Sequence, residues 1–154
     1  MATVTPPSEP ATAEPLATLT SPDGPNPTLR AHEEIKALLL TTADVYTYCY
    51  YADGNGTISR IFPNRFQPDP LVRSGSLELP DATGAFTLVA DIPNRTEEVR
   101  CMASTSDLGP RLPSDLQGED LTPLSVGSLD EISEMFLNLS AEVTEARLVA
   151  QVVP

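Results

Sequence analysis

Residues 45–62 read VYTYCYYADGNGTISRIF, and this stretch predicts the fold. Along an extended strand over residues 45–51, three tyrosines fall on one face, while Val, Thr, Cys and a fourth tyrosine fall on the other. Because both faces carry substantial side chains, we expect this strand to be central and covered on both sides. The turn dipeptides Asp53-Gly54 and Asn55-Gly56 supply the positive φ of a tight hairpin, so a second strand over residues 57–62 should pair with the first.

Short apolar runs on either side of this hairpin alternate with turn residues, as in an all-β domain. The further predicted strands are residues 35–41, 76–79, 86–91, 99–104 and 144–153. Residues 107–126 are rich in Leu, Pro, Ser, Asp and Gly, which predicts a long irregular loop that either covers the domain or has a function. Ser128 begins a capping box, and apolar residues at steps of three and four predict a helix over residues 129–142. The expected fold class is mostly β: an antiparallel β-sandwich with one C-terminal helix.

The first 27 residues differ in composition from the rest of the chain. They contain seven prolines, three acidic residues and no basic residue, which predicts a disordered or extended Pro-rich arm before a folded domain over residues 28–154. Leu16 and Leu19 within this arm suggest a hypothesis: a short piece of it adds as a strand to an exposed sheet edge of a neighbouring subunit.

Acidic residues outnumber basic ones by 22 to 9, which gives a formal net charge of −13, and Lys36 is the only lysine. Such a charge disfavours nucleic acid and anionic membranes as partners, although solubility alone also accounts for it. No apolar run approaches the length of a membrane helix, so no membrane insertion is expected. Residues 1–10 show no secretory signal, which leaves a cytoplasmic protein, or an envelope or extracellular domain cut from a longer precursor.

Cys49 and Cys101 fit neither a CxxC motif nor a metal-ligand spacing. The prediction is two buried thiols that act as small hydrophobic residues, and the alternative is one disulfide in an oxidising compartment.

The chain contains few of the residues and motifs that are typical of catalytic sites. His32 is the only histidine and stands among acidic residues, where an exposed polar role is expected. The segment that begins at Asp53 resembles the start of a calcium loop, but Ile58 stands where a glycine is needed and Asn64 where a bidentate Glu is needed. No Gly-rich phosphate loop, Walker pattern or HExxH motif occurs. We therefore expect no cofactor, no metal and no enzyme activity.

Arginine and aromatic residues cluster after the hairpin. Residues 57–75 hold three arginines and one acid, Asp69, in a strongly acidic chain. Arginine beside exposed aromatic surface is typical of protein interfaces. The predicted partner-binding residues are Arg60, Phe62, Pro63, Asn64, Arg65, Phe66 and Arg73. The structural alternative places Ile61, Phe62 and Phe66 in the core and makes Pro63-Asn64 a turn.

The order of the tyrosine strand, the Asp-Gly-Asn-Gly turn and the run Arg-Ile-Phe-Pro-Asn-Arg-Phe at residues 60–66 resembles the bacterial domain-of-unknown-function family 4384. Leu79-Pro80 and the strands at 86–90 and 99–104 fall where that family has a Pro-ended strand and later core strands. The resemblance covers residues 29–104. It implies an immunoglobulin-like sandwich, often appended to signalling, protease-like or envelope proteins, with no established activity.

The sequence therefore predicts a non-catalytic protein-interaction or assembly module whose partner is another protein or a copy of itself. Two alternatives from other classes stay open. One is a hydrolase that uses Cys49 or Cys101 with His32. The other is a carbohydrate- or cell-surface-binding sandwich, which the absence of tryptophan disfavours.

Overall fold

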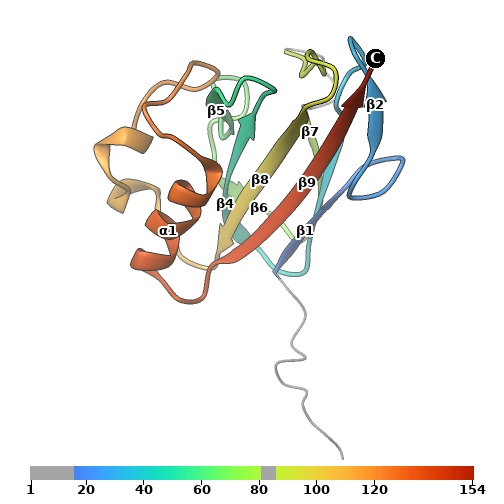
Figure 1. Cartoon of the computed structure of the whole chain (residues 1–154). Helices are drawn as coiled ribbons and strands as arrows, with labels where there is room; N and C mark the ends of the chain where they lie inside the picture. The colour runs from blue at the N-terminus through green and yellow to red at the C-terminus, as the bar shows by residue number, and fades with distance from the viewer. Residues whose placement is uncertain (1–15, 81–85) are drawn as a thin grey trace, which may run out of the picture.

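A computed structural model describes residues 16–80 and 86–154. Its strands form two sheets that pack face to face, with one α-helix and a long loop on the far side of the larger sheet (Figure 1). The loop contains two short 3-10 helices, Gly109–Arg111 and Ser114–Leu116. The smaller sheet has the order β1-β3-β7, from the strands Ala17–Thr20, Ala37–Thr41 and Gly75–Leu79. The larger sheet has the order β2-β9-β8-β4-β5, from Thr28–Arg30, Thr144–Val153, Thr96–Ser104, Val45–Ala52 and Ile58–Phe62. A two-residue strand, β6 (Leu71–Val72), also pairs with β4. The predicted β-sandwich is confirmed.

Strand β4 lies inside the larger sheet, antiparallel to β5 on one side and to β8 on the other. Val45 and Cys49 belong to the core between the two sheets, while Tyr48 and Tyr50 belong to a second core under the helix and the long loop. The alternation of the tyrosine strand therefore places its two faces in two separate hydrophobic layers. The prediction of a central strand covered on both sides is confirmed.

The helix α1 (Leu129–Leu139) begins as predicted, with the Ser128 side chain accepting a hydrogen bond from the Glu131 backbone N–H at 3.2 Å. It ends three residues earlier than predicted. Ser140 is extended, and its hydroxyl accepts from the Glu142 N–H at 3.2 Å. A local side-chain bond of this kind competes with the helix and turns the chain into β9.

Two cysteines that we expected to be free thiols form a disulfide, so that prediction is wrong and the alternative holds. Cys49 on β4 lies directly opposite Cys101 on β8, with 4.0 Å between their Cα atoms. Both side chains are fully buried. The antiparallel register brings the two side chains together on the same face of the sheet.

The predicted start of the folded domain at residue 28 is also wrong. Residues 17–20 form β1, whose Leu19 is 4 % exposed and which pairs antiparallel with β3 of the same chain. This piece therefore already pairs within its own chain, and the hypothesis that it adds to a neighbouring subunit stays a prediction. The apolar residues of β1 alternate inward, which offsets the cost of ordering the chain. The rest of the predicted arm, residues 1–15, lies outside the described residues.

The segment 86–91 does not form the predicted strand. It makes one bridge, between Val89 and Glu34, although Leu88 and Ala90 are buried as the alternation implies. Residues 32–35 form the backbone hydrogen bonds with this segment. His32 among them has a left-handed backbone conformation, with φ 79°, which ends the strand pairing after a few hydrogen bonds.

Candidate interaction surface

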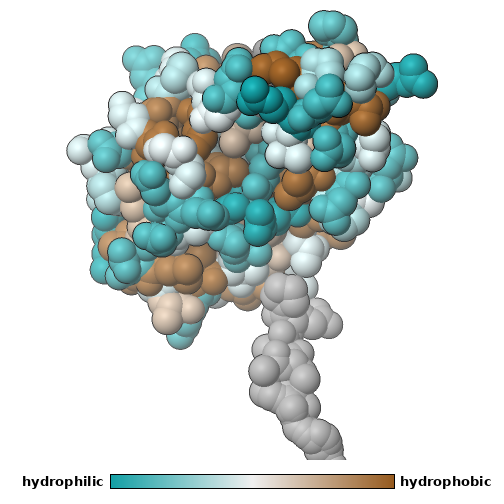
Figure 2. All heavy atoms as spheres, in the orientation of Figure 1, coloured by the Kyte–Doolittle hydropathy of each residue, from teal (hydrophilic) through white to brown (hydrophobic). Residues whose placement is uncertain are grey.

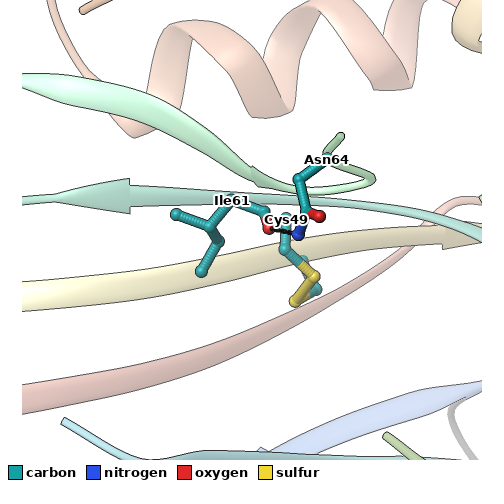
Figure 3. The surroundings of a disulfide bond; sticks show 4 residues. Cys49, Ile61 and Asn64 are labelled. Carbon is teal, nitrogen blue, oxygen red and sulfur yellow. Dashed lines mark hydrogen bonds between the residues drawn. A yellow bond between two sulfur atoms is a disulfide. The ribbon is translucent and has the colours of Figure 1, made fainter. Parts of the chain in front are cut away.

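The run Phe62-Pro63-Asn64 forms a turn that the Asn64 side chain holds together. The Asn64 amide donates to the Ile61 carbonyl at 2.8 Å, and its oxygen accepts from the backbone N–H groups of Phe66 and Gln67 at 2.8 and 2.9 Å. Figure 3 shows the first of these bonds in the surroundings of the disulfide. Phe62 and Asn64 are each 3 % exposed. For these residues the structure agrees with the alternative of a core phenylalanine and a turn.

Arg60 reaches from β5 to the long loop. Its Nε donates to the Pro63 carbonyl at 2.9 Å and its Nη1 to the Gly118 carbonyl at 3.0 Å. Both acceptors belong to the same chain, so the guanidinium of Arg60 stabilises the domain itself.

Arg65 binds the same loop through a carboxylate. Its backbone N–H donates to Asp120 Oδ2 at 2.7 Å, and its Nε and Nη2 donate to the two carboxylate oxygens at 3.2 Å each. Burial raises the pKa of Asp120, but the hydrogen bonds from Arg65 outweigh it and hold that pKa below its ordinary value. The ion pair thus fixes the loop over the end of β5.

The long loop covers the free edge of β5 beyond this ion pair. The backbone N–H groups of Leu121 and Leu124 donate to the carbonyls of Arg60 and Ile58 at 2.9 and 2.8 Å. Of the two roles expected for residues 107–126, the geometry shows the covering one.

A prediction follows from the Arg65–Asp120 pair. Since the folded-state pKa of Asp120 is lowered, its contribution to stability is fully present above the ordinary Asp pKa of about 3.9 and is lost as the pH falls through the lowered value. The melting temperature of the wild type should therefore fall more steeply than that of Asp120→Asn as the pH drops below about 4. Melting curves followed by circular dichroism measure this. Asp23→Asn, an exposed carboxylate of equal charge, should keep the steep wild-type profile; parallel profiles for all three proteins would contradict the expectation.

Two of the seven predicted partner-binding side chains are exposed and not fully engaged. The Arg73 side chain is 80 % exposed and lies 3.6 Å from the Asp44 carboxylate, a surface pair of little energetic weight. Phe66 is 50 % exposed and stacks on Phe86, with 6.5 Å between ring centroids and 20° between ring planes. The role of the seven residues in a partner interface stays a prediction.

Phe86 connects Phe66 to a groove on the outer face of the smaller sheet. The groove has a volume of about 590 Å³, and its walls are mainly apolar. We call it the Phe66–Phe86 groove and define it by Lys36, Leu38, Glu78, Pro80 and Phe86, with Phe66 stacked at its rim. Leu40, two residues along the same face, is 41 % exposed.

The groove was not predicted, but one signal points to part of it. Residues 37–41 read ALLLT, and on a half-buried strand the three leucines cannot all face the core. Leu39 is fully buried, so Leu38 and Leu40 face outward. No comparable signal marks Phe86, because its stacking partner is 20 residues away.

A second exposed apolar area lies on the helix. Hydrophobic and hydrophilic residues are interspersed over most of the face in Figure 2, and larger hydrophobic areas lie on the left, over α1 and the loops before it. Leu137 on α1 is 49 % exposed.

A polar pocket of about 500 Å³ lies between the hairpin turn and the start of α1. Its three arginines already bind within the chain. Arg95 donates to the Gly54 carbonyl at 3.1 Å, and Arg100 and Arg147 both donate to Glu98, at 2.8 and 2.9 Å. The arginines that line this pocket therefore belong to a network of hydrogen bonds and ion pairs within the chain.

The cysteines of the alternative hydrolase are not available as nucleophiles. Both cysteines are bonded to one another and buried, so neither offers a thiolate. His32 is exposed. Residues 16–80 and 86–154 contain no cluster of three His, Cys, Asp or Glu side chains arranged to hold a metal ion. Within the same residues, no helix is long and apolar enough to cross a membrane.

The tyrosines do not form an exposed platform for a sugar. All four tyrosines belong to strand β4, and each is buried or partly buried. Tyr48 donates to Asp107 at 2.7 Å and Tyr51 donates to Glu97. Burial, followed by these carboxylates, raises the pKa of both hydroxyls.

Comparison with known protein families gives a match. The sequence model of a protein family described as Domain of unknown function (DUF4384) matches residues 28–107. No curated protein and no solved structure matches the chain.

Proposed function

The chain belongs to the DUF4384 family of domains of unknown function, which confirms the resemblance found over residues 29–104, and from this premise we propose that it is a non-catalytic protein-interaction module. The observation that carries the proposal is the Phe66–Phe86 groove. Residues that dominate binding energy at interfaces are commonly aromatic side chains at apolar hollows, and here a half-exposed Phe66 stacks on the partly buried Phe86 of the groove wall.

The contacts of the arginines indicate which of the predicted residues are free to contact a partner. Arg60 and Arg65 bind the long loop of the same domain, whereas Phe66 has half of its surface in solvent. We therefore assign the partner contact to Phe66, Phe86 and the groove, and a structural role to the two arginines.

The disulfide supports a second part of the proposal. Disulfides persist in oxidising compartments, so we assign this domain to the cell envelope or the exterior. This is the second of the two locations that the sequence left open.

A photo-crosslinking residue at position 66 tests the proposal. With p-benzoylphenylalanine in place of Phe66 in the native cell, we expect one protein adduct, identified by mass spectrometry, that is absent with the same residue in place of Leu137. Leu137 is a matched control, since both side chains are about half exposed. Adducts from position 137 alone would move the contact surface to α1 and overturn the assignment.

The identified partner then permits an affinity measurement. Phe66→Ser should weaken its binding about tenfold or more, as removal of a central aromatic contact does, while leaving the melting temperature nearly unchanged. Leu137→Ser should leave the affinity within about twofold of wild type. Isothermal calorimetry measures both; equal affinities for all three proteins would remove the groove from consideration.

A further inference from the structure

The edges of the two sheets are not equally protected. Residues 121–124 cover the edge of β5, through the bonds to Ile58 and Arg60. The edge of β2 is three residues long and follows Pro25 and Pro27, and proline has no N–H to offer a further strand. Short length, proline and covering loops are the common devices by which proteins prevent strand addition.

The edge of β1 is held against the larger sheet. The backbone N–H of Leu16, just before β1, donates to the Thr144 hydroxyl at the start of β9 at 3.3 Å. Within residues 16–80 and 86–154, β7 pairs with β3 on one side only, so its other edge is left open.

The open edge of β7 presents backbone groups at known residues. The Gly75 N–H donates to the Thr41 hydroxyl on β3 at 3.0 Å, and Gly75 lies opposite Thr41 in the register. Backbone N–H and C=O groups alternate in direction along a strand, so those of Ser76 and Glu78 point away from β3. Both residues are exposed.

The Phe66–Phe86 groove lies beside this edge. Glu78 and Pro80, at the end of β7, line it together with Leu38 of β3 and Phe86. A strand laid along β7 would place every second side chain over the face that holds the groove. The edge supplies hydrogen bonds and the groove supplies an apolar site, which are the two parts of peptide recognition by strand addition.

Charge decides which segment fits. Glu34 also lines the groove, so two exposed carboxylates, those of Glu34 and Glu78, face one lysine there, Lys36, and the whole chain carries a formal net charge of −13. A second copy of the chain would bring two such charges together, which opposes self-association. A basic segment is complementary to the groove and is attracted to the chain as a whole.

We infer that β7 accepts an extended, basic segment of the partner protein as an added strand, with an apolar side chain in the Phe66–Phe86 groove. This inference rests on the proposed function and specifies its binding mode. The partner segment alternates apolar with Arg or Lys side chains.

A labelled synthetic peptide, Arg-Val-Arg-Phe-Arg-Val-Arg with blocked ends, is the probe, and fluorescence anisotropy measures its binding to the full chain. The same peptide with Glu in place of Arg should not bind. N-methylation of the second, fourth and sixth residues removes one set of alternate N–H donors, and N-methylation of the first, third, fifth and seventh removes the other set. Strand addition uses one set only, so one methylated peptide should bind like the parent and the other about tenfold more weakly or worse.

Two protein variants separate a local contact from general attraction between opposite charges. Glu78→Arg and Glu134→Arg change the net charge equally, and Glu134 is exposed on α1. We expect Glu78→Arg to weaken peptide binding about tenfold and Glu134→Arg to change it less than about twofold. Equal losses in the two variants would overturn the inference, as would equal binding of both methylated peptides.

The experiment distinguishes failure of the binding mode from failure of the proposed function. If both methylated peptides bind equally but Phe66→Ser weakens binding, the groove is a docking site and strand addition is wrong. If Phe66→Ser changes neither peptide binding nor the affinity for the partner identified by crosslinking, the proposed contact surface itself is wrong. Sedimentation equilibrium that shows a dimer, lost in Glu78→Arg, would replace the basic partner with a second copy of the chain.

Discussion

Replacing Cys49 and Cys101 together with alanine is expected to lower the free energy of unfolding by about 4 kcal/mol. The disulfide joins residues 52 apart in the sequence, and a loop of that length constrains the unfolded chain strongly. It also connects β4 and β8 at the centre of the larger sheet, where both cysteines are fully buried. Alanine at these positions leaves only small voids, so the loss should come mainly from the missing cross-link.

Urea unfolding followed by circular dichroism measures this loss. The reduced wild-type chain is the control, and it should unfold close to the double variant because neither protein has the cross-link. A difference of less than about 1 kcal/mol between the double variant and the oxidised wild type would contradict the expectation. Alkylation of the protein in its native cell should find both cysteines protected, as the proposed oxidising compartment requires.

Arg100→Met is expected to lower the free energy of unfolding by about 3 kcal/mol. The Arg100 side chain on β8 is 3 % exposed, and its guanidinium donates to Glu98 and Asp130 at 2.8 Å each and to the Ser133 hydroxyl at 2.9 Å. Glu145 lies 3.6 Å away and accepts from the same Ser133 hydroxyl. Removing the cation leaves three carboxylates near one another without it, which costs far more than the packing of a methionine returns.

Arg147→Met is the matched control for this effect. Arg147 also pairs with Glu98, at 2.9 Å, but its side chain is 51 % exposed. An exposed pair of this kind contributes less than about 1 kcal/mol. Urea unfolding at neutral pH compares the two variants. Similar losses in the free energy of unfolding would show that the burial of Arg100 does not determine its contribution to stability.

The interface prediction illustrates what composition alone can and cannot show. Three arginines beside aromatic residues in an acidic chain indicated a binding surface, but Arg65 binds Asp120, which is 55 residues away. Sequence composition does not distinguish an arginine that binds its own chain from one that binds a partner. Composition also does not show whether an aromatic residue is buried. Phe66 follows a Phe-Pro-Asn turn and could equally be a core residue, but it is half exposed.

Features set by neighbouring residues followed from the sequence alone. The alternation of residues 45–51, the turn after them and the Ser128 cap are properties of adjacent backbone and side chains, and each formed where predicted. Of the two turn glycines, Gly56 has the predicted positive φ and Gly54 does not. The final strand, Thr144–Val153, has the predicted bounds. These features were sufficient to predict a sandwich with a C-terminal helix.

Tertiary structure alone decided the features that join distant residues. The disulfide depends on the register of β4 and β8. Residues 17–20 form the strand β1 because they pair with β3, where Leu19 becomes buried. The Phe66–Phe86 groove depends on two segments meeting beside an open sheet edge. The physical reason is that local geometry is fixed by backbone dihedrals and side-chain size, whereas contacts across the chain form only once strands have packed and excluded water.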